Sequence, residues 1–443
     1  MTELPPGWAR TTLGELGAYI NGRGFKRSEW SRQGRPIIRI QNLTRTNSQF
    51  NHFDGEIESR YIVSTGALLV SWAATLDAFI WRGPEAVLNQ HIFKVDSKID
   101  ERFHYHLIKY LLTKLAETAH GSGMVHVTRS RFESVDVALP PLAEQRRIVE
   151  VLEDHLSRLD AAVYGLDKGV KRVEKLRKRI IVSAIPVELP SGWRMITTGE
   201  AGKVELGRAR HPDWHTGSHM KKYLRVANVF EDRIDETDLM QMNFPPEVFE
   251  KYRLLPGDVL LNEGQSPEYL GRPAMYRGSP REVAFTNSLI RFQAGPDVLP
   301  EWALLVFRRH MHAGRFLREV RITTNIAHLS ATRLKSVEFP VPPIEEQRRI
   351  TAEVATRLYE VEHFRAALDM ARRRSDCLRR SLLTEAFAGR LVPQDPNDEP
   401  ASVLLDRIKA ERAATTKPPR APRKPKRPAS DYTVGVPEKE TLF

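Results

Sequence analysis

PPLAEQRRI at residues 140–148 and PPIEEQRRI at residues 342–350 differ only at their third and fourth positions. Other segments recur in the same order. LPPGW (4–8) resembles LPSGW (189–193), and LNQHIFKV (88–95) resembles FTNSLIRF (285–292). Chance matches between short motifs would not keep one order along a chain. The repeat therefore predicts an internal duplication of a domain-sized unit.

Each copy of this motif predicts the start of a long helix. Proline is tolerated in the first helical turn, and Glu144 complements the helix dipole there. The apolar residues that follow alternate three and four apart, as in a coiled-coil seam. In the first copy they include Leu152, Leu156, Leu159, Val163, Leu166, Val170 and Val173, and in the second Ile350, Val354, Leu358 and Val361.

We expect the two helices to pack on each other as an antiparallel coiled coil, because that arrangement buries both apolar stripes. Two alternatives stay open. Gly165 and Gly169 could mark a chain reversal that turns the first helix into a hairpin, or each helix could pack on its own globular domain.

The remaining segments predict two mixed domains. Short β-type runs punctuated by Gly, Pro and Asn precede each long helix, with one shorter helix inside each (101–119 and 301–317). The predicted class is α+β with a pseudo-two-fold internal repeat. Its parts are a first mixed domain (1–140), a long helix (141–186), a second mixed domain (187–341), a second long helix (342–389), a C-terminal extension with a short helix (390–413), and a disordered, basic, proline-rich tail (414–443).

Composition favours a polyanionic partner. The 443 residues carry a formal net charge of +12, which favours nucleic acid or an anionic surface. Cys377 is the single cysteine, so an internal disulfide is impossible. With no signal-peptide pattern and no apolar run long enough for a bilayer, we expect a cytoplasmic protein.

Motifs for catalysis are weak. GEAGKV (199–204) lacks the spacing of a phosphate-binding loop, and NFPP (243–246) has the letters of an amino-methyltransferase motif in the wrong order. HPDWHTGSH (211–219) spaces three histidines four apart, but its proline and glycine indicate a loop. We therefore expect no catalytic residue, no metal site and no cofactor on this chain.

Loops carry the candidates for DNA contact. Clustered lysines and arginines suit phosphates, and amide, hydroxyl and arginine side chains suit base edges. For any one of them a solvated loop side chain is the competing interpretation. The candidates are Arg23, Lys26, Arg27, Ser71, Gln90, His91, Arg129 and Arg131 in the first copy, and Arg208, Arg210, Lys221, Lys222, Gln265, Asn287, Ser288, Thr323, Thr324 and Asn325 in the second.

The chain resembles the specificity subunit of Type I restriction–modification systems. The resemblance rests on the Pro-Pro-Leu-x-Glu-Gln-x-x-Ile signature, the LPxGW entries and the ending LLTEAFAGRLVPQDPNDEPASVLLDRIKAER (382–412). It covers about residues 1–413. Ile344, where leucine is more usual, is a mild departure.

That resemblance implies two target-recognition domains, each reading one half of an interrupted, asymmetric DNA site, with the helices setting the spacing. It implies partners too: methyltransferase subunits, expected to be two, which dock on the helices and use S-adenosyl methionine to methylate adenine, and motor-nuclease subunits. The chain itself would not be an enzyme. The alternatives are a self-sufficient sequence-specific DNA-binding regulator or architectural protein, and a chain that is itself a methyltransferase or nuclease.

The repeated motif has two interpretations of its own. Its polar residues either hold the junction between domain and helix or form a docking site for the methyltransferase. They are Gln145, Arg146, Arg147, Gln347, Arg348 and Arg349. Trp8 and Trp193, at matching places, are predicted to be core anchors.

Overall fold

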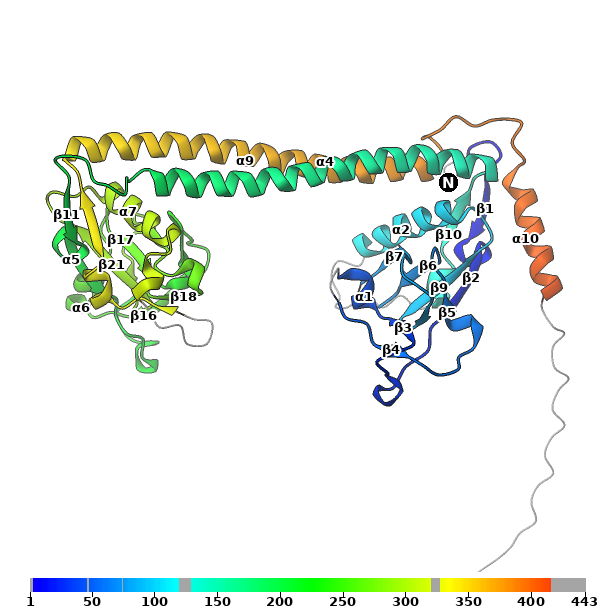
Figure 1. The fold of residues 1–443 in the computed structure, drawn as a ribbon, viewed down its shortest axis with the longest axis horizontal. Coiled ribbons are helices and arrows are strands. Elements are labelled where there is room, and N and C mark those ends of the chain that lie inside the picture. Colours follow the sequence, from blue (N-terminus) through cyan, green and yellow to red (C-terminus); the bar gives the residue numbers. More distant parts are fainter. Residues whose placement is uncertain (1–2, 46–47, 74, 119–128, 320–326, 416–443) are drawn as a thin grey trace, which may run out of the picture. The chain divides into compact units, whose positions relative to one another are not determined.

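The computed structural model describes residues 3–45, 48–73, 75–118, 129–319 and 327–415. The chain forms two compact units. Unit 1 combines residues 1–159 with residues 377–443, and unit 2 comprises residues 160–376. Both ends of the chain therefore belong to one unit. Figure 1 shows the elements of each.

Three small sheets build the mixed domain of unit 1. The strands β1 (Ala9–Thr12) and β10 (Asp136–Leu139) form an antiparallel pair. A four-stranded antiparallel sheet has the order β2-β9-β6-β7, and another four-stranded sheet has the order β4-β3-β8-β5. Their bounds are β2 Gly17–Asn21, β9 Ile92–Ser97, β6 Leu68–Ser71, β7 Asp77–Ile80, β4 His52–Phe53, β3 Arg35–Ile38, β8 Ala86–Leu88 and β5 Ile62–Val63. Helix α2 (Glu101–Thr118) and the short helices α1 (Ile40–Thr44) and α3 (Arg129–Glu133) complete this domain.

Unit 2 repeats this topology. The strands β11 (Arg194–Thr197) and β23 (Glu338–Val341) pair as β1 and β10 do. The order β12-β21-β17-β19 matches β2-β9-β6-β7 of unit 1, and β16-β13-β20 matches the first three strands of β4-β3-β8-β5, including one parallel pair, β13 with β20, where unit 1 has β3 with β8. This match confirms the internal repeat. The bounds are β12 Gly202–Leu206, β21 Leu289–Ala294, β17 Val259–Asn262, β19 Pro273–Met275, β16 Met240–Asn243, β13 Met220–Leu224 and β20 Ala284–Phe285.

The second unit also has a hairpin of β14 (Val229–Phe230) with β15 (Arg233–Ile234) and a long-range antiparallel pair of β18 (Gly264–Gln265) with β22 (Ala327–His328). Its helices besides the long pair are α5 (Thr198–Ala201), α6 (Pro246–Tyr252), α7 (Pro300–His312) and α8 (Ala331–Lys335). Helix α7 packs on the four-stranded sheet through the fully buried Trp302 and Phe307.

The two long helices are α4 (Leu142–Ser183) and α9 (Ile344–Phe387). Within unit 2 they pair antiparallel, because Asp167 bonds Arg372, Glu174 pairs with Arg365, and Arg177 lies 3.2 Å from Glu362. Helix α4 runs unbroken through its two glycines, so the hairpin alternative is wrong.

The apolar stripes of α4 and α9 also contribute residues to the cores of the two mixed domains. In unit 1, Ile148 and Leu152 of α4 and Ala386 of α9 belong to the main core. In unit 2, Ile181 of α4 and Val354 of α9 do the same. The coiled coil and packing on a domain are thus not exclusive, since one stripe does both at different points along its length.

The C-terminal extension is part of unit 1. Helix α10 (Ala401–Thr415) buries Leu404, Leu405 and Ile408 in the unit 1 core. The guanidinium of Arg412 donates to the carbonyls of Gly14 and Gly17 at 2.9 and 2.8 Å. The predicted tail beyond Thr415 lies outside the described residues. None of the helices described is both long and apolar enough to cross a membrane.

Candidate nucleic-acid interface

Equivalent tight β-turns with polar side chains lie in the two units. In unit 1 the amide of Ile92 donates to the carbonyl of Asn89 at 3.2 Å, which leaves Gln90 and His91 as the exposed central residues. In unit 2 the amide of Leu289 donates to Thr286 at 2.9 Å, with Asn287 and Ser288 at the centre. We call these the 89–92 turn and the 286–289 turn.

Equivalent backbone hydrogen bonds brace the two turns. Asn89 N donates to Ile38 O at 3.2 Å and Thr286 N to Leu224 O at 3.1 Å. On the far side, the amide of Trp72 approaches the carbonyl of His91 at 3.5 Å, and that of Glu263 donates to Ser288 at 3.0 Å. Neighbouring strands thus hold each turn from two sides.

A glycine–arginine pair crosses beneath each turn. Gly22 N donates to Ile92 O at 3.1 Å, and Gly207 N donates to Leu289 O at 3.2 Å. A Cβ atom on Gly22 would lie 2.2 Å from the carbonyl oxygen of Asn89, and one on Gly207 would lie 2.2 Å from that of Thr286. Only glycine permits so close an approach of two backbones.

The arginines that follow are held by aromatic rings. The Arg23 guanidinium lies 4.5 Å from the ring centre of Phe25 and 5.0 Å from that of Phe53, and it pairs with Glu29. Arg208 is equivalent, at 3.9 Å from Trp214 and 4.9 Å from Phe244.

Arg208 was predicted to contact DNA, and its side chain is not available for that. The residue is 8% exposed and donates to Asn243 O at 2.5 Å, while burial lowers the pKa of its guanidinium. Arg23 retains part of its surface but is held in the same way. The sequence signal for this role is the cluster of lysines and arginines in these loops, which suits phosphate contacts.

The central side chains of the turns differ in their freedom. Gln90 Nε2 and His91 Nε2 lie 3.1 Å apart, and the His91 ring packs edge-on against Trp72. The Ser288 hydroxyl accepts from Val226 N at 3.1 Å. Gln90 and Asn287 are the exposed residues at the first central position of each turn.

Two other predicted base contacts have different environments. Ser71 is fully buried, and its hydroxyl donates to Ala73 O at 3.3 Å, so the prediction of DNA contact by this side chain is wrong. Gln265 is half-buried in the β18–β22 strand pair, where its Oε1 accepts from Ser266 N at 3.2 Å. Thr323, Thr324 and Asn325 lie outside the described residues.

The predicted cations fall into two groups. Lys221 bonds Glu282 at 2.7 Å, and Arg129 bonds Glu133 at 2.8 Å. The others are exposed, and several flank the glycine–arginine pairs or lie on the neighbouring strand β13. They are Lys26, Arg27, Arg131, Arg210 and Lys222.

The repeated motif forms a buried junction. Trp8 Nε1 donates to Glu144, and Trp193 Nε1 donates to Glu346 Oε2 at 2.9 Å, so each LPxGW segment is fixed to the first turn of a long helix. Trp8 is almost wholly buried and Trp193 partly so. Burial raises the pKa of Glu144, against the lowering effect of its hydrogen bonds with Gln394 and Trp8.

The motif glutamines connect each long helix to the loop before the domain helix. Gln145 Oε1 accepts from Asp100 N at 3.1 Å, and Gln347 Oε1 accepts from Leu299 N at 2.8 Å. Both are fully buried, and their amides donate to Pro140 O and Pro342 O at 2.9 Å. The two glutamines thus lie buried between a mixed domain and a long helix, as the junction interpretation expects.

The motif arginines differ from one another. Arg147 forms a bidentate pair with Asp398 of the C-terminal extension, at 2.5 Å for the shorter contact. Arg146, Arg348 and Arg349 are exposed. Docking through these three stays a prediction.

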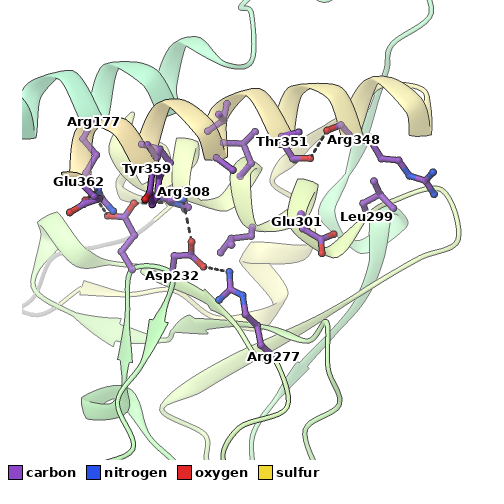
Figure 2. A pocket seen from close by; sticks show the side chains of 17 residues that line it. Arg177, Asp232, Arg277, Leu299, Glu301, Arg308, Arg348, Thr351, Tyr359 and Glu362 are labelled. Atoms are coloured by element: carbon purple, nitrogen blue, oxygen red, sulfur yellow. Dashed lines mark hydrogen bonds and ion pairs between the residues drawn. The ribbon is translucent and has the colours of Figure 1, made fainter. Parts of the chain in front are cut away.

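Unit 2 also contains a groove of about 700 Å³ beside α9. Figure 2 shows apolar side chains of α7 and α9 lining it, with a charged cluster at one end. Glu231, in the turn between β14 and β15, bonds Arg177 of α4 and Arg308 of α7 at 2.8 Å each. His312 Nε2 lies 3.0 Å from the same carboxylate.

This cluster connects the mixed domain of unit 2 to both long helices. Burial on its own would raise the pKa of Glu231, but the hydrogen bond with His312 and the charge of Arg308 hold it far below its usual range. Sequence patterns did not reveal it, because its members are far apart in the chain. Among the described residues, no group of three or more His, Cys, Asp or Glu side chains is placed to hold a metal.

Comparison with known proteins agrees with this architecture. Residues 5–164 match the family model of the Type I restriction modification DNA specificity domain. The Type I restriction enzyme EcoBI specificity subunit of Escherichia coli is 24% identical over 92% of this chain and 93% of its own length. The EcoKI specificity subunit of E. coli K12 is 22% identical over 93% of this chain and 97% of its own.

Solved structures show the same fold. A chain from a study of complex assembly in the type I R-M system superposes with a TM-score of 0.71 at 19% identity, covering 88% of this chain and all of that one. The HsdS subunit from Thermoanaerobacter tengcongensis gives 0.53 at 20% identity, covering 88% of this chain and 99% of that subunit. The fold and the repeated turns define a duplicated protein of two similar units. Over residues 5–164 the chain is similar to the Type I restriction modification DNA specificity domain, and over most of its length to Type I specificity subunits.

Proposed function

We propose that this chain is the DNA specificity subunit of a Type I restriction–modification complex, in which the mixed domain of each unit reads one half of an interrupted, asymmetric site. One observation carries the proposal. The two units repeat one backbone framework, yet the side chains at the centre of the equivalent turns differ, Gln90 and His91 against Asn287 and Ser288. Two readers of different half-sites need a common scaffold with different side chains.

The charge distribution supports a nucleic-acid partner. The net charge of +12 favours a polyanion. Exposed Lys26 and Arg27 follow the Gly22–Arg23 pair in unit 1, and in unit 2 exposed Arg210 follows the Gly207–Arg208 pair and exposed Lys222 lies on β13. Cations of this kind position a protein on phosphates and add no sequence preference.

The long helices suit a spacer. Helices α4 and α9 each contribute residues to both units, so they connect the two mixed domains covalently. At about 1.5 Å per residue, a helix of that length fixes a separation that a flexible linker would not. We propose that this separation sets the spacing between the half-sites.

Catalysis belongs to the partners in this proposal. Two methyltransferase subunits, which bind S-adenosyl methionine, dock on the long helices and flip an adenine from each half-site for methylation. Motor-nuclease subunits complete the restriction complex, and the complex acts in the cytoplasm. The chain itself supplies recognition and spacing, and holds no cofactor.

The test is the methylation pattern of the assembled complex. The chain is co-expressed with methyltransferase subunits from the same organism in a host without adenine methylation, and methylated adenines are mapped by single-molecule sequencing. A single bipartite site is expected. Specific DNA binding by the chain alone, with no methylation and no recovery of methyltransferase, would favour the self-sufficient regulator instead.

Shortening the two long helices provides a second test of the proposed function. Deleting residues 167–173 together with 366–372 removes facing heptads, by the register of Asp167 with Arg372. About 10 Å of helix is lost, or about three base pairs, with the helix phase nearly kept. We expect a shorter gap between unchanged half-sites. New half-site sequences at unchanged spacing would contradict the spacer role.

A further inference from the structure

We infer that Gln90 and Asn287 are specificity-determining residues, one for each half-site, and that Arg23 and Arg208 act as positioning residues beneath them. The inference rests on the proposed function and assigns roles within it. It concerns four side chains at equivalent positions of the duplicated units.

The first step is equivalence. The backbone of Arg23 bridges to Asn89, and that of Arg208 bridges to Thr286, both in parallel orientation. Arg23 N donates to Leu88 O at 3.0 Å, and Arg208 N donates to Phe285 O at 3.2 Å. Counting forward from these bridges, Gln90 and Asn287 occupy the same position of the same turn.

The second step is preorganisation. A side chain reads a base edge well only if its backbone is held in place before the DNA arrives. Both turns are closed by their own hydrogen bond and braced by two flanking strands. The glycine beneath each one brings a second backbone within van der Waals contact.

The third step is the division of labour within the turn. The second central residue is engaged locally, His91 with Trp72 and Ser288 with Val226 N. The first central residue is exposed in both units. Both first residues carry a side-chain amide, the group that pairs with the N6 and N7 atoms of adenine through two hydrogen bonds.

The arginines explain how the turn keeps its position. Each guanidinium lies within about 5 Å of two aromatic rings, a placement that fixes a cation firmly. Its backbone is hydrogen-bonded to the residue that begins or precedes the turn. For Arg208, burial removes the side chain from direct DNA contact, so its influence on DNA passes through the 286–289 turn.

The experiment uses the full chain in the methyltransferase complex, with genome-wide maps of methylated adenine as the measurement. Asn287→Asp and Gln90→Glu keep size and exposure but replace an amide donor with an acceptor. Each is expected to change or abolish the preference at one position of a single half-site, and the two variants should affect opposite halves. Unchanged maps, or changes in both halves from one variant, would overturn the assignment.

Positioning is tested with Arg208→Lys and Arg208→Met, against Arg210→Ala as an exposed neighbour. The Arg208 variants should weaken the base preference at the same half-site position as Asn287→Asp does. The preference of Arg208→Lys should be closer to that of the wild type. Arg210→Ala should lower methylation by a similar factor at all sites without changing the sequence. If Arg208→Met lowers methylation uniformly, Arg208 has a merely structural role and the positioning claim fails.

The two proposals can fail separately. If the wild-type complex methylates no bipartite site, the proposed function itself is wrong. If the wild-type map is bipartite and stays unchanged in the turn variants, the specificity-subunit function stands and the assignment of Gln90 and Asn287 is wrong.

Discussion

The indole nitrogen of Trp8 lies 3.1 Å from both carboxylate oxygens of Glu144. This contact joins the two motifs that recur in the sequence, LPxGW and PPxxEQ, and Trp193 repeats it with Glu346. Each motif recurs because its bonding partner recurs. The pair fixes where the chain enters the domain relative to where the long helix begins.

Trp8→Phe should destabilise unit 1 by about 1–3 kcal/mol, because the buried carboxylate of Glu144 loses a donor. Urea unfolding of the full chain measures the change. Trp30→Phe is the control, since Trp30 is 38% exposed and lies in an exposed loop. Equal effects of the two substitutions would mean that the hydrogen bond adds nothing beyond ring packing.

Substituting a motif glutamine should lower the free energy of unfolding much more than substituting an exposed motif arginine. Gln347→Ala removes the acceptor of Leu299 N and the donor to Asp297 O and Pro342 O, and should cost about 1–3 kcal/mol of unfolding free energy. Arg348→Ala, on the exposed face one residue along, should change stability by less than about 0.5 kcal/mol.

Substitutions of two exposed motif arginines, one from each copy, test the docking interpretation. If the exposed arginines receive the methyltransferase, Arg146→Ala and Arg348→Ala should weaken its co-purification while the chain unfolds as the wild type does. Normal assembly by the double variant would leave the motif with its junction role alone.

Sequence reasoning succeeded where the signal was periodic or repeated. The heptad stripe beginning near Leu152 predicted α4, and the paired motifs predicted duplication. It failed where tertiary packing determines whether a side chain is exposed. Ser71 and Arg208 have residue types that suit DNA, but Ser71 is in a buried strand and Arg208 lies under aromatic rings. A residue's type indicates what it can bind, whereas burial determines what it can reach.

The Glu231 cluster shows the same limit. Its members come from α4, the β14–β15 turn and α7, and no spacing in the sequence connects them. The repeat gave no hint either, because the β14–β15 hairpin is an addition of the second unit. In unit 1, Glu153 of α4 instead binds His106 of α2 at 3.2 Å. Each unit thus fastens its domain helix to α4 differently.

Glu231→Gln should destabilise unit 2 by about 3 kcal/mol at pH 7, because two buried arginines lose their carboxylate. The folded-state pKa of Glu231 lies below its ordinary value of 4.5, so its stabilising contribution is fully present above that value. The contribution is lost as the pH falls from 4.5 toward the folded-state pKa. Unfolding free energies of both proteins should therefore converge below pH 4.5.

Glu362→Gln is the matched control for this cluster. Glu362 binds the same Arg177 at 3.2 Å, but its side chain is 54% exposed. An exposed pair contributes little, so the substitution should change the unfolding free energy by less than about 1 kcal/mol. A pH-independent difference between the wild type and Glu231→Gln would contradict the lowered pKa.

The C-terminal extension should be essential to unit 1. Leu405→Ala, at a position 5% exposed in the unit 1 core, should cost about 2–4 kcal/mol. Val403→Ala, on the same helix but 41% exposed, should cost much less. Hydrogen exchange of β1 and β10 amides reports on unit 1 directly, and faster exchange is expected in Leu405→Ala alone.

Three glycines offer a final test of which backbone positions the function uses. A Cβ on Gly165 of α4 would meet no atom within 4 Å, so Gly165→Ala should stabilise the helix by up to about 1 kcal/mol. A Cβ on Gly207 or Gly22 would lie 2.2 Å from a turn carbonyl, so alanine there must displace the 286–289 or the 89–92 turn. Because each turn belongs to one unit, Gly207→Ala and Gly22→Ala should impair opposite half-sites in methylation maps, while Gly165→Ala leaves both intact. If Gly207→Ala and Gly22→Ala fold and methylate the wild-type sequence, the close backbone approach has no part in recognition.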